Sequence, residues 1–215
     1  MGLSSALVEQ VDGVFADMDV PQHPGAALLV IDHGERLYSK GYGLADLETQ
    51  RPITADSSFY PLVFDASRPA RHKLVQGYLE EEGQFRPWDY PLLTAGDGGL
   101  FSTLDDLFLW DQALNTERLV PKAALEQAFT SGTTNDGTPI DYGFGWYTNR
   151  FPGHRHVAHG GSLGAHNSFI IRFLDIQRTI IVLTNLGPIE PVYRPPGLRG
   201  PGPRARQVAE ILFSD

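Results

Sequence analysis

Residues 159–185 read HGGSLGAHNSFIIRFLDIQRTIIVLTN, and this stretch decides the fold. It begins with a glycine-flanked strand start, His159-Gly-Gly161, and continues into two apolar runs at 167–174 and 179–184. A polar turn at 175–178 joins the two runs, a pattern typical of a β-hairpin. The stretch therefore predicts a strand that begins near His159 and is followed by an antiparallel hairpin.

The N-terminal part of the chain carries a second hairpin pattern. Residues 25–32 form an apolar run, the pair His33-Gly34 suits a turn, and residues 36–42 form another strand-like run. Residues 3–18 place apolar side chains at near-helical spacing, and residues 204–213 predict a short closing helix. Together these segments predict an α+β fold, an antiparallel β-sheet flanked by N- and C-terminal helices.

The length suits a single domain over residues 1–215. We expect residues 1–60 and 140–215 to form the sheet and its terminal helices, and residues 61–139 to form a reduced region of helices and loops. Three helical stretches are expected in that region: an acidic stretch at 79–82, a helix N-capped by Ser102, and a helix from Pro121 to about Phe129.

Composition excludes several classes of function. The formal net charge is −9, so a nucleic-acid partner has little electrostatic support. The chain has no cysteine and therefore no disulfide and no thiol nucleophile. Its first 14 residues carry no signal-peptide pattern, and no segment has the length of a membrane span. We expect no nucleic-acid or membrane partner, and a cytoplasmic location is the default.

Several short motifs follow one another along most of the chain: Pro24-Gly-Ala-Ala27, Lys40-Gly-Tyr-Gly-Leu-Ala-Asp-Leu-Glu48, Arg51-Pro-Ile-Thr54, the Gly98-Gly-Leu100 turn with the helix after it, Tyr142-Gly-Phe-Gly-Trp146 and His159-Gly-Gly161. In this order they resemble serine β-lactamases, penicillin-binding proteins and their class C-like, esterase and D-aminopeptidase relatives. The resemblance implies a β-lactamase/transpeptidase-like fold.

The nucleophile motif of that family, Ser-x-x-Lys, is missing from this sequence. The residues three positions before the three lysines are Leu37, Ala70 and Leu119. We interpret this as an internal deletion at about Val63/Phe64 that removes the nucleophile helix and the helical subdomain with its Tyr-x-Asn motif. One Tyr-x-Asn string, Tyr147-Thr-Asn149, falls on a strand position, and we interpret it as a coincidence.

The resemblance assigns the candidate catalytic residues His159, Gly161 and Ser162 to a residual Lys-Thr-Gly-like strand. Such a strand presents backbone N–H groups to an oxyanion and a polar head group to the substrate. Its middle residue here is Gly160, which lacks the usual hydroxyl. The alternative is that the glycines form a tight strand entry needed only for folding.

Two further combinations of residues could form a site. Ser162 with His159 or His166 and an Asp is a possible hydrolytic triad, although no Gly-x-Ser-x-Gly motif is present. His154, His156 and His159 are spaced so that they could bind Zn²⁺ or Ni²⁺, the alternative being a polar loop before a strand. We expect no cofactor.

Three functional hypotheses follow. The first is a catalytically impaired or inactive scaffold of the β-lactamase-like fold, with a small acyl or β-lactam-like compound as its possible ligand. The second is a homo-oligomeric binding or assembly module, since loss of a subdomain exposes apolar surface. The third is a residual hydrolase or esterase that uses an unconventional serine or a metal.

Overall fold

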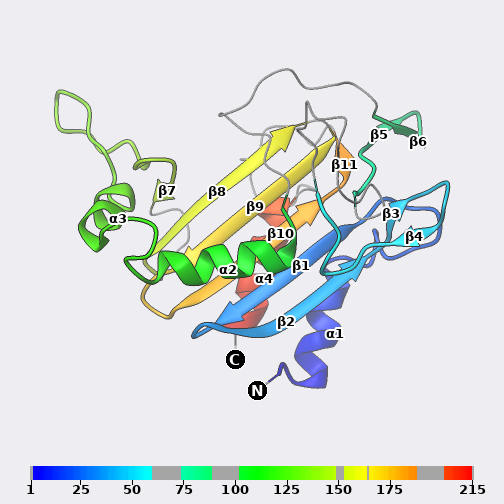
Figure 1. Cartoon of the computed structure of the whole chain (residues 1–215), viewed down its shortest axis with the longest axis horizontal. Coiled ribbons are helices and arrows are strands. Elements are labelled where there is room, and N and C mark those ends of the chain that lie inside the picture. Colours follow the sequence, from blue (N-terminus) through cyan, green and yellow to red (C-terminus); the bar gives the residue numbers. More distant parts are fainter. Residues whose placement is uncertain are drawn as a thin grey trace.

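The computed structural model describes residues 2–59, 74–88, 102–148, 153–163, 165–187 and 201–214. Its centre is a six-stranded antiparallel sheet with the strand order β2-β1-β10-β9-β8-β7 (Figure 1). The strands of this sheet are β1 (Ala26–Asp32), β2 (Glu35–Tyr42), β7 (Tyr147–Thr148), β8 (His156–Leu163), β9 (His166–Phe173) and β10 (Arg178–Thr184). Both predicted hairpins are confirmed, with each strand starting or ending within a residue of its expected position.

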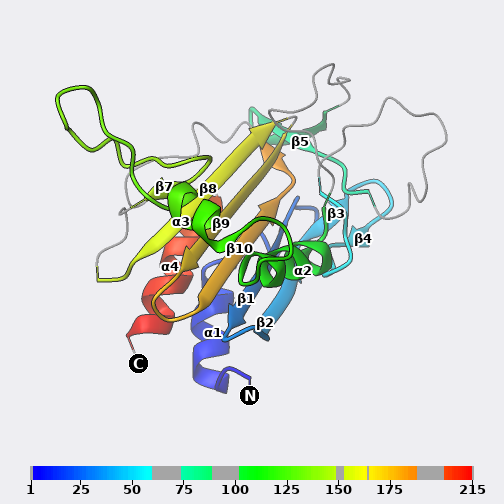
Figure 2. The same ribbon diagram turned by 60° about the vertical axis from the view of Figure 1, so that its left-hand side comes forward.

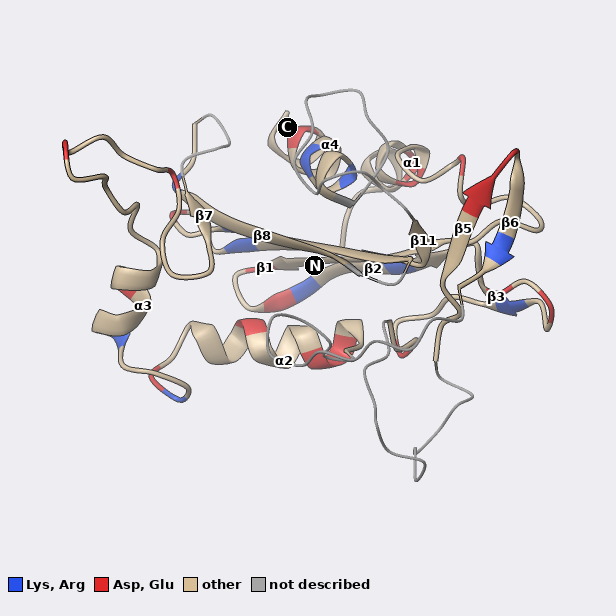
Figure 3. Cartoon of the chain, turned by 90° about the horizontal axis from the view of Figure 1, so that it is seen from above, with Lys and Arg blue, Asp and Glu red and all other residues tan. Residues whose placement is uncertain are grey.

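Helices cover the two faces of this sheet. Helices α1 (Ser5–Gly13) and α4 (Pro201–Phe213) lie on one face, and α2 (Leu104–Leu114) lies on the other (Figure 3). Figure 2 shows α1 and α4 side by side. A fourth helix, α3 (Lys122–Ala128), follows α2 beyond the end of the sheet. The α+β prediction, with terminal helices flanking an antiparallel sheet, is therefore confirmed.

Strands β1 and β10 are buried on both faces, and their alternate residues enter different cores. Leu28 and Val30 of β1 pack in a cluster with side chains of α1 and α4, among them Val11 and Val208. Their neighbours on β1 join Leu104 of α2 in a second cluster on the opposite face. The continuous apolar runs in the sequence therefore mark strands that contribute to two cores at once.

A polar cluster fastens α1 to β2. Asp12 accepts hydrogen bonds from Tyr38 Oη (2.5 Å), Tyr42 Oη (2.8 Å) and Lys40 Nζ (2.7 Å). Burial alone would raise the pKa of Asp12, but the hydrogen bonds from Lys40 and the two tyrosines outweigh burial and hold this pKa below its usual value. Phe15, which follows α1, stacks on the ring of Tyr42 at 4.4 Å between centroids.

The reduced middle region differs from the prediction in two places. The acidic stretch expected to be helical is instead a β-hairpin of β5 (Tyr78–Glu81) and β6 (Gln84–Pro87). Its two-residue turn, Glu82-Gly83, has positive φ angles of 52° and 77°, as a type I′ hairpin turn requires. The N-cap of α2 is Thr103 rather than Ser102, because the Thr103 hydroxyl accepts from the Asp106 N–H at 3.0 Å.

Two small sheets complete the described part of the chain. Strand β11 (Leu186–Gly187) pairs with β5, and β3 (Leu44–Asp46) pairs with β4 (Arg51–Pro52). Helix α4 begins at Pro201, three residues before the expected start, and α3 lies within the predicted limits. Among the described helices, none is both long and apolar enough to span a membrane.

The proposed deletion point, Val63/Phe64, lies outside the described residues, but the segments on either side of it meet. Val75 donates its N–H to the Ser58 carbonyl (2.9 Å), and Phe59 donates to the Ser102 carbonyl (3.0 Å). Ser58 and Phe59, which precede the proposed deletion point, thus form β-bridges with Leu74 and Ser102, which follow it.

Candidate functional site

Strand β8 carries the candidate site residues and lies between β9 and the short edge strand β7. The register pairs His159 with Ile170 and Gly161 with Ser168. Strand β7 pairs only with Val157 and Ala158 of β8. Within the described residues, the outer edge of β8 beyond Ala158 therefore has no strand partner.

Two tyrosines contact the imidazole of His159. The Tyr142 hydroxyl lies 3.0 Å from His159 Nε2, and the Tyr147 ring stacks on the imidazole at 5.5 Å with an interplanar angle of 15°. Burial lowers the pKa of His159, while a hydrogen bond to the Gly160 backbone opposes that shift. Since the net direction is downward, the neutral imidazole is favoured at neutral pH.

The two tyrosines are brought together by the tight turn Tyr142-Gly-Phe-Gly-Trp146. Gly145 has a φ of 78°, which favours glycine, and a Cβ added at Gly143 would lie 2.0 Å from the Ala128 carbonyl oxygen. Trp146 anchors the turn against Trp110, with 6.0 Å between ring centroids. The glycines in this motif are therefore required by the geometry that holds both tyrosines at His159.

Gly161 lies beside Ser168, and a Cβ built on it would be 3.0 Å from Ser168 Oγ. A larger residue would thus need the serine side chain to move. Gly161 is exposed and Gly160 is half-buried, so the backbone of this segment is accessible to a small molecule. This arrangement is compatible both with an open binding edge and with a tight strand entry.

Ser162 does not share a face of β8 with His159. The two residues are three apart in one strand, so their side chains leave opposite faces. Ser162 instead faces its register partner Asn167. His166 is buried, and its Nε2 lies 3.1 Å from the Val75 carbonyl oxygen. This geometry gives no support to a triad of Ser162 with His159.

The three histidines considered as metal ligands do not converge. His156 is buried, and its Nδ1 is 2.9 Å from the His154 carbonyl, whereas His154 Nδ1 is 2.9 Å from Asp175 Oδ2. Strand alternation places His156 and His159 on opposite faces of β8. No group of three or more His, Cys, Asp or Glu side chains arranged to hold a metal ion occurs among the described residues.

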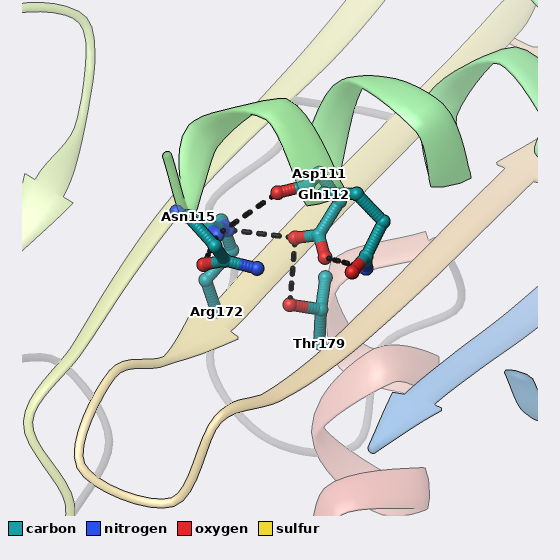
Figure 4. A network of polar contacts seen from close by, with 5 residues as sticks. All are labelled: Asp111, Gln112, Asn115, Arg172 and Thr179. Atoms are coloured by element: carbon teal, nitrogen blue, oxygen red, sulfur yellow. Dashed lines mark hydrogen bonds and ion pairs between the residues drawn. The ribbon is translucent and has the colours of Figure 1, made fainter. Parts of the chain in front are cut away.

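A buried polar network on the α2 face was not predicted from the sequence (Figure 4). Arg172 Nε donates to Asp111 Oδ1 at 2.7 Å, with both side chains almost fully buried at 4% and 2% exposure. Thr179 donates its hydroxyl to the same carboxylate oxygen (2.9 Å), and Arg172 also reaches Asn115 Oδ1 (2.7 Å). Two sequence features could have indicated this network: Arg172 is a cation inside the apolar run 167–174, and Asp111 is an acidic residue within a predicted amphipathic helix.

Tyr142 was likewise not predicted as a site residue. The sequence identified its motif only as part of a family resemblance, and its contact with His159 joins positions 17 residues apart. The signal that could have found it is the pair of glycines in Tyr142-Gly-Phe-Gly-Trp146, which predicts a turn that returns the chain beside the tyrosine.

Comparisons with known proteins agree with this fold. The chain matches the Beta-lactamase family over residues 11–60 and 62–196. It is 41% identical to penicillin-binding protein 4* of Bacillus subtilis (strain 168) over 91 residues, a segment that makes up 42% of this chain and 20% of that protein. It is 29% identical to the D-aminopeptidase of Gluconobacter oxydans (strain 621H) over 104 residues, a segment that makes up 48% of this chain and 20% of that protein. The matched segments thus span 20% of the length of these curated relatives.

A solved structure shows the same fold at low sequence identity. The octameric penicillin-binding protein homologue from Pyrococcus abyssi superimposes with a TM-score of 0.73 at 15% identity, covering 97% of this chain and 77% of that one. Together, the family match over most of the chain and the antiparallel sheet with its terminal helices establish that this chain belongs to the beta-lactamase family.

Proposed function

We propose that this chain is a non-acylating member of the beta-lactamase family, a scaffold that retains one wall of the ligand site without the nucleophile. The observation that carries the proposal is the lack of Ser-x-x-Lys at all three lysines, Lys40, Lys73 and Lys122. In relatives that serine attacks the carbonyl, and its lysine takes part in the proton transfers. Without this serine and lysine, the acyl-enzyme of the family's mechanism cannot form.

The internal deletion at about Val63/Phe64 belongs to this proposal. Two observations support it: the family match is interrupted at residue 61, and the backbone on either side of the point is bridged through Ser58 and Phe59. Only 14 residues, 60–73, separate Phe59 from Leu74 in the sequence, too few for a helical subdomain. The motif similarities favour the class C, esterase and D-aminopeptidase branch of the family as the source of the fold.

The proposed ligand is a small acyl or β-lactam-like compound that binds without reaction at the His159–Gly161 strand. Backbone N–H groups at this edge can donate to a carbonyl oxygen, as in an oxyanion site. His159 adds a hydrogen-bonding ring, and the glycines allow close approach.

Intact mass spectrometry tests the proposal. The purified protein, expected near 23.7 kDa, is incubated with a fluorescent penicillin and separately with a fluorophosphonate, beside an active serine β-lactamase as positive control. We expect no adduct on this chain under conditions that label the control completely. A stoichiometric adduct would overturn the proposal, and comparison with Ser162→Ala would then show whether Ser162 is the reacting serine.

A second candidate function is a homo-oligomeric assembly module. It is favoured by large apolar side chains left exposed around α2 and the Tyr142–Trp146 turn: Leu109 is 64% exposed, Phe144 is 74% exposed and Trp110 is 39% exposed. Surfaces of this kind often mark sites of association.

Light scattering after size-exclusion chromatography, over a hundredfold range of concentration, tests this candidate. An assembly module is expected to show a mass that rises with concentration and falls back to the monomer in Leu109→Ser/Phe144→Ser. Val20→Ser is the matched control, since Val20 is an exposed apolar residue near α1 on a different part of the surface. Monomer mass at every concentration would exclude a stable homo-oligomer.

A further inference from the structure

Helix α2 exposes the side that lies opposite its buried ion pair. We infer that this outer side is a dimerisation surface, on which a second copy of the chain packs its own α2 in antiparallel orientation about a two-fold axis. The inference rests on the second candidate function, the homo-oligomeric assembly module, and names its interface. Two observations carry it: an exposed apolar centre, and unbalanced charges of opposite sign at the two ends of the helix.

The apolar centre lies in the middle of α2. Leu109 and Trp110 occupy successive positions of the helix, and both side chains are exposed. No described helix or strand lies beyond α2 on its side of the sheet (Figure 3). Large apolar side chains at the centre of a surface, and aromatic ones above all, are typical of the part of an interface that loses contact with water.

The surface is held in place from the inner side of the helix. Asp111, which follows Trp110, is buried in the ion pair with Arg172. The Trp110 ring itself stacks on Trp146, with 6.0 Å between centroids and 14° between ring planes. Because the helix and its aromatic side chain are already fixed, association requires little ordering of this surface.

Unbalanced negative charge lies at the N-terminal end of α2. Its first turn contains two acidic residues, Asp105 and Asp106. Asp105 is paired with Arg36, whereas Asp106 is exposed and takes part in no ion pair within the described part of the chain. The carboxylate of Asp106 is therefore available to a cation from another molecule.

Unbalanced positive charge lies beyond the C-terminal end of α2. Arg118 and Lys122 are exposed, and neither side chain forms an ion pair with a described residue. The one acidic residue beside them, Glu117, accepts from the backbone N–H of Lys122 at 3.1 Å. Two cations and one carboxylate leave this end with a net positive charge.

Antiparallel packing of two α2 helices matches these features. A two-fold axis that crosses the helix between its charged ends places the acidic end of each copy beside the cationic end of the other. Leu109 lies between Asp106 and Arg118 in the sequence, so both copies contribute it to the shared centre. A parallel arrangement would bring like charges together at both ends. Since one surface carries both halves of the match, the partner is a second copy of this chain.

The length of α2 sets the strength expected of the dimer. The helix has 11 residues and is therefore about 16 Å long. A surface of this length is small beside the roughly 800 Å² that each partner buries in a standard stable interface. We therefore expect a dissociation constant in the micromolar rather than the nanomolar range.

A charge-exchange experiment tests the interface. Sedimentation equilibrium over a hundredfold range of concentration compares the native chain with Asp106→Lys and with Arg118→Glu. Each substitution alone opposes like charges at both ends of the symmetric dimer and should weaken self-association at least about tenfold. An equimolar mixture of the two variants should associate about as strongly as the native chain, because a mixed dimer has opposite charges at both ends again.

Two controls accompany this experiment. Glu9→Lys makes the same charge reversal on the exposed side of α1 and should leave association unchanged. Circular dichroism checks that each variant is folded, and Arg118→Glu lies outside α2, so it leaves the charges of the first helical turn as they are.

Cross-linking measures the orientation of the two helices. The chain has no cysteine, so Asp106→Cys and Arg118→Cys each introduce a single thiol. With a short bismaleimide, we expect a cross-linked dimer from the mixture of these two variants and none from Asp106→Cys alone. A cross-link within Asp106→Cys would overturn the antiparallel arrangement.

The remaining outcomes separate this interface from the function on which it rests. Self-association that neither charge reversal weakens, or that the mixture fails to recover, would overturn the interface and leave the assembly module standing. A native chain that stays monomeric at every concentration would overturn both.

Discussion

The α1/α4 face and the α2 face of the sheet share the same central strands, yet they are held by different chemistry (Figure 3). On the first face, apolar side chains of both terminal helices close over Leu28 and its neighbours. On the second, a short helix is tied to the sheet by the buried pair Asp111–Arg172, while its outer residues Leu109 and Trp110 stay exposed. The first face is closed by a hydrophobic core, whereas the second combines a hydrophobic cluster around Leu104 with a buried ion pair, and the outer side of its helix stays exposed.

This difference has an energetic consequence. A hydrophobic core distributes its stabilisation over many contacts, so no single one dominates. A buried ion pair concentrates it, because removal of one partner leaves the other charged and desolvated. The two faces should therefore respond differently to substitution.

The largest effect is expected for Asp111→Ala. It leaves the Arg172 guanidinium buried without its carboxylate and should lower the free energy of unfolding by about 3–5 kcal/mol. Urea denaturation followed by circular dichroism measures the loss. The double variant Asp111→Leu/Arg172→Met is the control and should lose much less, since no charge is left unpaired. A small loss for the single variant would mean that the α2 face does not depend on the pair.

The next effect is expected on the other face, for Leu28→Ala. Leu28 is fully buried between β1 and the terminal helices, so truncation leaves a cavity and should cost about 3 kcal/mol. Leu28→Met keeps most of the volume and should cost less than about 1.5 kcal/mol in the same denaturation experiment. Similar losses for both variants would contradict the close packing described for this core.

A pH effect should also arise on the α1/α4 face, from His156. Burial lowers the pKa of His156 below the usual histidine value of about 6.5, so the unfolded chain binds a proton more readily than the folded one. Stability should therefore be complete above about pH 6.5 and decline as the pH falls toward the folded-state pKa.

Thermal unfolding between pH 5 and 8 measures this slope. His156→Gln should flatten it in part, because His159 also has a lowered pKa and contributes in the same direction. His33→Gln, which removes an exposed imidazole, controls for loss of a histidine as such. An unchanged slope in His156→Gln would show that His156 does not contribute to the pH dependence of stability.

The smallest effect is expected for Leu109→Ser. At 64% exposure its side chain contributes little to the folded monomer, and the free energy of unfolding should change by no more than about 0.5 kcal/mol. Denaturation at low protein concentration is the measurement. A loss that grows with protein concentration would instead show that this surface is covered by another copy.

Much of the fold could be predicted from local patterns. The apolar runs around Val30 and Val182 and the turn pair His33-Gly34 predict two hairpins because strand pairing across a tight turn depends on neighbouring residues. The β5–β6 hairpin was missed because Leu79–Glu82 lacks strand propensity, and the strand forms through tertiary pairing with β11 instead.

The candidate site residues His159 and Gly161 come from the glycine-rich sequence in the middle of β8, and their role stays a prediction. The lack of a Ser-x-x-Lys motif is evident in the sequence. Tyr142 could not be assigned to the site, because its hydrogen bond to His159 depends on how the turn folds onto the edge of the sheet. The geometry that separates Ser162 from His159 likewise depends on strand register.

The sequence by itself determined the family, the two hairpins of the main sheet with the terminal helices, and the lack of a Ser-x-x-Lys motif, since these are properties of residue type and spacing along the chain. Only the tertiary structure decided which groups meet: the side chains of Tyr142 and His159, the side chains of Asp111 and Arg172, and the backbones of Ser58 and Val75. The physical reason is that hydrogen bonds and buried ion pairs join residues far apart in sequence, and their formation depends on packing that local patterns do not encode.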